Sequence, residues 1–124
     1  MLGVAAAGTP LSRALAALAN APLAGDLPAT RLGGGETVLT RAAVKDFQAS
    51  LRGPVLMAGQ DGYDHARKVW NGMIDRRPAL IARCSAAADV ARSVQFATAN
   101  DLLVAVRSGG HSTSGQSVCD GGLM

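Results

Sequence analysis

Aromatic residues are scarce in this sequence. Its 124 residues include two Phe, one Tyr and one Trp, so a core must be built mainly from Ala, Val, Leu and Ile. Apolar residues make up 48% and charged residues 17%, which suits a globular core and argues against wholesale disorder. The length fits one small domain or part of a larger one.

A basic surface of the kind that binds nucleic acid is also missing. The net charge is only +3, and the arginines are spread along the chain apart from the pair Arg76–Arg77. No basic stripe with interleaved aromatic residues occurs, so we expect no nucleic-acid partner. The mild positive balance suits a small anionic ligand such as a pyrophosphate.

The two cysteines, Cys84 and Cys119, form no C-x-x-C pair and no Cys/His cluster, which excludes the usual zinc sites. They are two free thiols or, in an exported protein, one disulfide; the sequence leaves both open. We expect Cys84, at the end of a strand, to be a small buried side chain.

Long uncharged apolar runs are absent too. Arg13 interrupts the Ala- and Leu-rich leader at residues 1–25, so no run reaches the ~20 residues of a membrane span. The leader resembles the apolar part of a secretory signal, with Ala19–Ala21 as a small-x-small site. The lack of a basic start and Pro22 after that site favour an Ala-rich amphipathic helix instead. Localisation, cytoplasmic or exported, stays open.

Glycine, by contrast, is abundant and marks the predicted boundaries. Residues 25–40, with the run Gly33–Gly35, read as a linker, so residues 1–40 are predicted to be leader and linker and residues 41–124 a domain. Thr40 is a plausible N-cap for a helix over 41–51 whose buried face carries Val44, Phe47 and Leu51.

The remaining pattern alternates between strands and helices. Strands are predicted at 54–58, 79–83 and 102–106, and helices at 63–71 and, after an N-cap at Ser85, up to about Asn100. The last helix should bury a stripe of Ala86, Val90, Val94 and Ala97. Strand, helix and strand from 79 to 107 form a βαβ unit with parallel strands, so the predicted fold class is α/β.

A glycine-rich loop, R-S-G-G-H-S-T-S-G-Q-S, follows the last strand at 107–117. Such loops bind phosphates, because glycine tolerates φ > 0 and successive N–H groups can converge on an anion. Its glycines do not fit G-x-G-x-x-G. A P-loop nearly fits, but Gln116 stands where Lys is required. A P-loop-like nucleotide-binding module is therefore the weaker alternative.

The stretch R-S-G-G-H-S-x-x-G with C-D-G-G after it, together with W-N-G-M-I-D-R-R-P at 70–78, resembles the berberine-bridge-enzyme-like FAD-linked oxidases, which have a PCMH-type FAD-binding domain. The resemblance covers about residues 50–124. It implies that this chain is the first lobe of that domain, with a βαβ unit and flanking helices. The Gly-rich ending at residues 121–124 leads us to expect that the domain is incomplete.

The resemblance also implies a cofactor site. The loop would wrap the FAD pyrophosphate, and His111 aligns with the histidine that many members bond to the flavin 8α-methyl group. The family's second, cysteine tether lies later in the chain, so Cys119 is not assigned to it. The implied cofactor-binding residues are Arg107, Ser108, Gly109, Gly110, His111, Ser112 and Gly115.

The implied activity is FAD-dependent oxidation of a hydroxyl- or amine-bearing carbon in a small molecule, with hydride transfer to the flavin and dioxygen or another acceptor reoxidising it. No catalytic base is assigned, and these residues alone are expected to be inactive; a truncated, non-catalytic remnant is a further alternative. Outside the loop, we expect Trp70 and Tyr63 to pack in the core, and His65 and the Arg76–Arg77 pair to be solvated.

Overall fold

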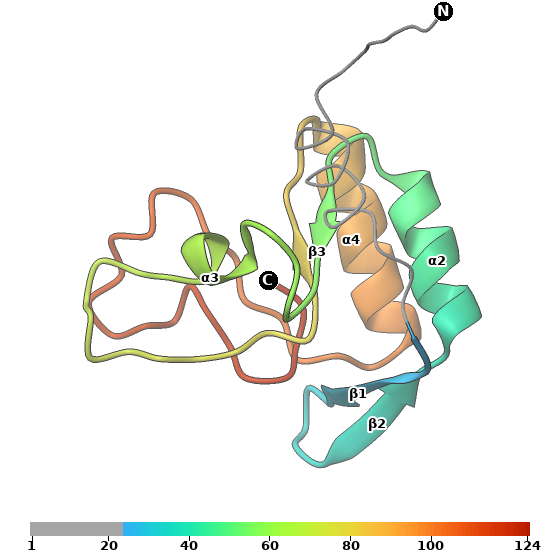
Figure 1. Ribbon diagram of the computed structural model, residues 1–124, viewed down its shortest axis with the longest axis horizontal. Helices are drawn as coiled ribbons and strands as arrows, with labels where there is room; N and C mark the ends of the chain where they lie inside the picture. The colour runs from blue at the N-terminus through green and yellow to red at the C-terminus, as the bar shows by residue number, and fades with distance from the viewer. Residues whose placement is uncertain (1–23) are drawn as a thin grey trace, which may run out of the picture.

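The computed structural model describes residues 24–124, and Figure 1 shows their path. The predicted leader lies almost entirely outside the described residues. The elements are β1 (Leu27–Thr30), β2 (Glu36–Leu39), α2 (Arg41–Ser50), β3 (Val55–Leu56), α3 (Tyr63–Ala66), β4 (Ile81–Ala82) and α4 (Ala87–Ala99).

The segment predicted to be a linker is a β-hairpin, so that prediction was wrong. β1 and β2 pair antiparallel from Leu27 opposite Leu39 to Thr30 opposite Glu36. Gly34 and Gly35, with φ of 91° and 87°, form the turn that connects them. Each strand has only four residues, which is too short to show a clear alternating pattern.

Helix α2 begins and packs as predicted. The Thr40 hydroxyl accepts a hydrogen bond from the Ala43 N–H at 3.1 Å, which is a side-chain N-cap. Val44 and Phe47 are buried, and Leu51 follows them at the C-cap. The Phe47 ring stacks on Phe96 of α4 with centroids 4.1 Å apart, so α2 and α4 lie side by side (Figure 1).

Helix α4 is confirmed, and Ala97 of its predicted buried face is buried, but the prediction was wrong for Val90, for Val94 and for the N-cap. Asp89, Ser93 and Ala97 are buried, whereas Val90 and Val94 are more than half exposed. Residue 86, not Ser85, occupies the cap position, and its side chain makes no cap hydrogen bond. The helix is turned because Asp89 has its own buried partners, which hydrophobic periodicity does not reveal.

Asp89 joins the end of α2 to the start of α4. Its fully buried carboxylate accepts hydrogen bonds from the N–H groups of Arg52, Gly53 and Ser85 at 2.9–3.0 Å and from the Ser85 hydroxyl. These bonds, those to the Arg52 and Ser85 N–H first, hold the pKa of Asp89 well below its ordinary value. Buried and charged, Asp89 replaces the apolar residue expected at this face.

The two segments of the predicted βαβ unit are parallel, as expected, but a third segment lies between them. Leu123 forms parallel bridges with both Leu80 and Val104, so the segments around 80 and 104 are parallel to each other but separated by residues 122–124. The Ala105 N–H donates to Leu123 O at 2.9 Å, and the Met124 N–H to Leu80 O at 3.0 Å. The chain is therefore α/β, although residues 102–106 form bridges and not a full strand.

The helix predicted at 63–71 ends after one turn, and two packing predictions near it were wrong. Tyr63 is buried as expected, and its hydroxyl donates to Pro78 O at 2.7 Å. Trp70, predicted to be in the core, is 73% exposed; it lies beyond the end of α3, and its backbone N–H donates to Gly110 O. Cys84 is exposed and not buried, and both cysteines are free thiols. His65 is exposed, as predicted.

Candidate functional site

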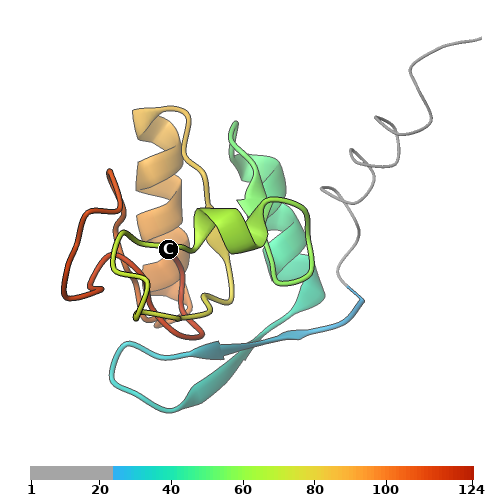
Figure 2. The same cartoon turned by 60° about the vertical axis from the view of Figure 1, so that its left-hand side comes forward.

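Two loops lie side by side at the end of the molecule away from α2. One is the glycine loop, residues 107–118, which follows the segment at 102–105; the other is the flanking loop, residues 67–78, which follows α3. Both views show the two loops together (Figures 1 and 2). The predicted site residues all belong to the glycine loop.

Arg107, the first residue of the glycine loop, joins the loop to the end of α3. Its guanidinium donates to the Ala66 carbonyl at the end of α3. A Cβ on Gly110 would lie 2.8 Å from Arg107 Nη2, so the guanidinium fills the space under that glycine. Arg107 was predicted as a cofactor-binding residue; in the structure its visible bond orients the loop.

Two glycines of the loop have backbone conformations that other residues avoid. Gly110 has φ of 73° and Gly115 has φ of 75°. A Cβ on Gly115 would lie 2.8 Å from Ile74 Cγ2, which belongs to the flanking loop. These glycines therefore serve both the turn of the chain and the close approach of the two loops.

The peptide groups of the glycine loop are satisfied unequally. The carbonyls of Gly110, Thr113 and Gly115 accept bonds from Trp70 N–H, Asn71 Nδ2 and Arg76 Nη1 of the flanking loop, at 2.7–3.0 Å. Within the described residues 24–124, the N–H groups of residues 108–112 donate no hydrogen bond. A run of N–H groups without partners, beside carbonyls that are already bonded, can serve as a cradle for an anion.

Side chains of the loop add donors near that run. Ser112 Oγ lies 3.3 Å from Ser114 Oγ and accepts from the Gln116 N–H at 3.2 Å. His111 is exposed and folds over Gly109, because a Cβ there would lie 2.6 Å from His111 Cδ2. Among the residues that the structure describes, its imidazole has no hydrogen-bond partner, so it is open to a ligand.

Arg76 ties the two loops together, and sequence reasoning assigned it to solvent. Its Nη1 donates to the carbonyls of Gly115 at 2.7 Å and Val118 at 3.1 Å. It is partly buried, so the solvated-loop prediction was wrong for Arg76, while Arg77 is exposed. No local pattern marks Arg76, because its partners are about 40 residues away in the chain.

Arg67 holds the flanking loop in shape. It forms ion pairs with Asp64 and Asp75 and donates to Arg76 O at 3.2 Å. The hydrogen bonds to Asp75 and Asp64 raise the pKa of Arg67 further above its usual range, and the same bonds lower the pKa of both carboxyl groups. The flanking loop is thus held by charge-assisted bonds at its base.

A groove of about 570 Å³ begins at the first residues of the glycine loop and runs along α4. Arg107 and Ser108 line one part, and the exposed valines of α4 and of residues 104–106 line another. Its basic side chains are those of His65, Arg83 and Arg107. The cradle and an apolar surface therefore adjoin each other.

Two residues after the loop differ in chemistry. Cys119 is buried, and burial raises the pKa of its thiol, so it is a poor nucleophile; this agrees with leaving it unassigned as a flavin tether. Ser117 Oγ is buried and has no hydrogen-bond partner among the described residues. Sequence reasoning missed Ser117 as an unsatisfied polar group, because only the tertiary structure shows its burial.

Other kinds of site find no support within residues 24–124. No group of three or more His, Cys, Asp or Glu side chains is arranged to hold a metal ion there. In that same part of the chain, no helix has the length and apolar character needed to cross a bilayer. No helix follows Gln116 in the described chain, so the P-loop alternative lacks the helix N-terminus that it requires.

Comparisons with known proteins relate part of this chain to flavin-dependent oxidases. The family model described as an FAD binding domain matches residues 78–124. The (R)-6-hydroxynicotine oxidase of Paenarthrobacter nicotinovorans is 44% identical over 75 residues, which are 60% of this chain and 16% of that protein. Over these segments the chain is similar to FAD-linked oxidases. Its mixed α/β fold is consistent with part of a PCMH-type FAD-binding domain, which the family model matches at residues 78–124.

Two further comparisons agree with this assignment. An uncharacterized FAD-linked oxidoreductase of Bacillus subtilis (strain 168) is 33% identical over 75 residues, covering 60% of this chain and 17% of that protein. The crystal structure of 6-hydroxy-D-nicotine oxidase from Arthrobacter nicotinovorans superposes with a TM-score of 0.57, at 44% identity, over 60% of this chain and 16% of that one. The chain spans about a sixth of the length of these relatives.

The cofactor of the FAD-linked oxidase domain is FAD, and the glycine loop fits it. The domain match includes the whole loop, and the open N–H groups suit a pyrophosphate. Cβ atoms at positions 110 and 115 would meet Arg107 and Ile74, so glycine at both positions lets the loop fold closely against these side chains. The fit thus rests on the loop's own geometry as well as on its relatives.

Proposed function

We propose that this chain is the N-terminal FAD-binding portion of an FAD-dependent oxidoreductase and that its glycine loop binds the FAD pyrophosphate. The observation that carries the proposal is the run of open N–H groups at residues 108–112, beside carbonyls already bonded to the flanking loop. Ser108, Gly109, Gly110, His111 and Ser112 would supply the donors, Gly115 would close the loop and Arg107 would orient it.

His111 is proposed as the site of covalent flavin attachment. Its exposed imidazole has no partner among the described residues, so a ring nitrogen is free to bond the 8α-methyl carbon. Such a bond would replace one methyl proton and the imidazole proton, and the two electrons left over would pass to dioxygen or another acceptor. A tether of this kind would prevent loss of the cofactor.

The reaction class is proposed from the family resemblance. The bound flavin would accept a hydride from a hydroxyl- or amine-bearing carbon of a small molecule, as in berberine-bridge-enzyme-like oxidases. The protein residues described here would bind and orient the cofactor. None of them is proposed as the catalytic base, because the relatives are about six times longer than the matched segment.

Acid denaturation of the full-length protein tests both proposals. Yellow colour that stays with the precipitated protein is expected for a covalent flavin, and a colourless pellet with yellow supernatant would rule out the tether. His111→Ala should abolish the covalent colour and weaken FAD retention. His65→Ala is the matched control, since His65 is the other histidine of this sequence and is also exposed. Unchanged FAD binding in His111→Ala would contradict the loop assignment.

A further inference from the structure

The most exposed aromatic side chain in the described structure adjoins the glycine loop. Trp70 is 73% exposed, whereas Phe47 and Tyr63 are no more than 4% exposed. In a sequence so poor in aromatic residues, leaving the largest apolar ring in water gives up the stabilisation that its burial would bring. The position therefore calls for something that covers the ring.

Trp70 is held in register with the loop. Its N–H donates to Gly110 O at 2.8 Å, and the next side chain, Asn71, donates to Thr113 O at 3.0 Å. Asn71 Oδ1 also accepts from the Met73 N–H at 3.1 Å, which orders the turn after the tryptophan. The indole thus projects from a backbone anchored at the residue before His111.

The anchoring identifies the part of the cofactor within reach. The carbonyl of Gly110 is directly joined to His111, which is the proposed attachment point of the flavin 8α-methyl group. A ring fixed there is closer to the isoalloxazine than to the adenine at the other end of the dinucleotide. Indole is electron-rich and isoalloxazine is electron-poor and planar, so the two surfaces are suited to stacking.

We infer that the exposed indole of Trp70 stacks on the isoalloxazine ring of the FAD held by residues 108–112. This inference rests on the proposed function. It makes Trp70 a cofactor-binding residue of the flanking loop, in addition to the residues of the glycine loop. Stacking of this kind covers the indole and positions the ring system beside His111.

Flavin emission in the full-length protein tests the contact. An indole in contact with the excited flavin quenches it by electron transfer, whereas a phenyl ring, which is harder to oxidise, does not. Trp70→Phe and Trp70→Ala should therefore raise the emission of the bound flavin severalfold over the parent protein. Both variants should melt at the parent temperature, because the side chain is exposed.

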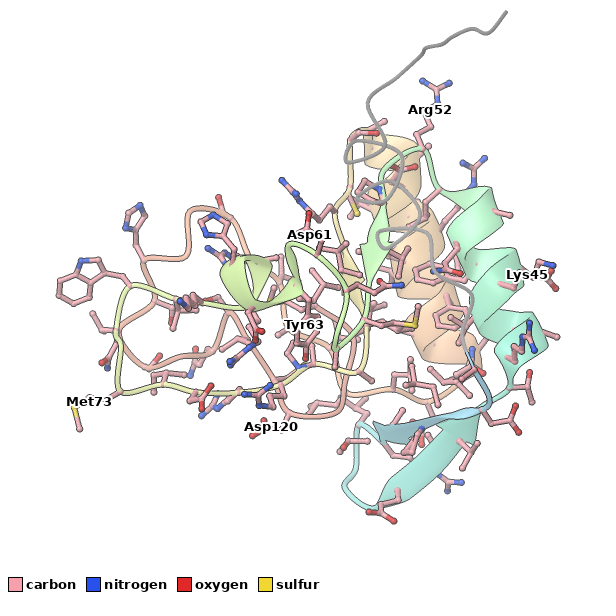
Figure 3. The ribbon with its side chains drawn as sticks, in the orientation of Figure 1. Lys45, Arg52, Asp61, Tyr63, Met73 and Asp120 are labelled. Atoms are coloured by element: carbon pink, nitrogen blue, oxygen red, sulfur yellow. The ribbon has the colours of Figure 1, made fainter. Side chains whose placement is uncertain are left out.

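Met73→Ala is the matched control, because Met73 lies on the same loop and is 92% exposed (Figure 3). Its flavin emission should equal that of the parent protein. Equal emission from the parent and Trp70→Phe would overturn the inference and leave the proposed function standing. An equal rise in Met73→Ala would also overturn it, by showing general loosening of the loop. Purified protein that takes up no FAD would overturn both.

Discussion

The two halves of this molecule are held together by different forces. The helix–sheet half, made of the β1–β2 hairpin, β3, β4, α2 and α4, surrounds the larger apolar core (Figure 1). The loop half, made of the flanking loop and the glycine loop, is tied by Arg67, Arg76 and Arg107 to backbone carbonyls. A small apolar cluster of Leu56, Tyr63 and Ile81 packs α3 against β3 and β4.

The difference explains how a loop can be ordered and still be open to a ligand. Apolar packing requires burial, and burial would hide the N–H groups that bind an anion. Arginine–carbonyl hydrogen bonds fix the same backbone while leaving its N–H donors unpaired within the described residues. Positioning by polar bonds therefore suits the proposed binding of the pyrophosphate, because an apolar core would cover the N–H groups that this proposal uses.

The largest predicted effect is in the helix–sheet half, from Gly53→Ala. A Cβ at this position would overlap the Arg83 carbonyl oxygen and lie 2.9 Å from its carbon, and backbone atoms cannot swing away. We expect a loss of about 3 kcal/mol or more in the free energy of unfolding, measured by urea denaturation.

Gly33→Ala is the control for that change, since nothing lies within 4 Å of a Cβ there. Its unfolding free energy should stay within about 0.5 kcal/mol of the parent value. Similar stabilities for the two variants would show that the junction between α2 and β3 is looser than the structure indicates.

Asp89→Asn should give the second-largest loss. The carboxylate now accepts hydrogen bonds from the N–H groups of Arg52, Gly53 and Ser85. An amide would place its own N–H donors against some of these groups. We expect the melting temperature to fall by roughly 10 °C. Asp46→Asn, at an exposed position of α2, should change it little, and an equal fall in both variants would contradict the role of Asp89.

Asp89 should also make the stability of the protein depend on pH. The folded-state pKa of Asp89 lies below its ordinary value of 3.8, so its stabilisation is fully present above that value and is lost as the pH falls towards the folded pKa. Melting temperatures should therefore drop below about pH 4 in the parent protein. The drop should be shallower in Asp89→Asn; parallel curves would contradict it.

In the loop half, Arg76→Ala should affect binding more than folding. Removing its bonds to Gly115 O and Val118 O is expected to cost about 2 kcal/mol of stability at most. Amide exchange at residues 112–118 should quicken, and FAD retention by the full-length protein should fall. Arg77→Ala is the control, because the Arg77 side chain is 60% exposed; equal effects would show that charge alone matters.

The smallest predicted effect is that of Ser117→Ala. The buried hydroxyl has no partner among the described residues, so its removal should leave the unfolding free energy unchanged or raise it by up to about 1 kcal/mol. A thermal melt provides the measurement. A loss of stability would show that Ser117 has a bound water or another partner.

Local signals predicted the parts of the fold that depend on neighbouring residues. The Thr40 cap and the buried face of α2 follow from side chains within one or two turns of each other. Predictions failed where the structure depends on residues far apart in the sequence. The buried face of α4 contains Asp89, which bonds residues near position 53, and residues 122–124 lie between the two parallel segments. Trp70 lies outside the predicted helix, and its N–H donates to Gly110 O. Contacts between residues tens of positions apart in the chain do not affect the local periodicity of apolar residues, so the sequence pattern could not predict them.

The amino-acid sequence alone determined which chemical groups are present: a glycine-rich loop with a histidine follows an apolar segment. This combination is typical of a phosphate site and of flavin-linked oxidases. Only the tertiary structure decided which groups of that loop are free. The flanking loop binds the carbonyls and leaves the N–H groups of residues 108–112 open. Each backbone N–H or C=O group needs a hydrogen-bond partner, so whether it can bind a ligand depends on which groups of the protein lie against it.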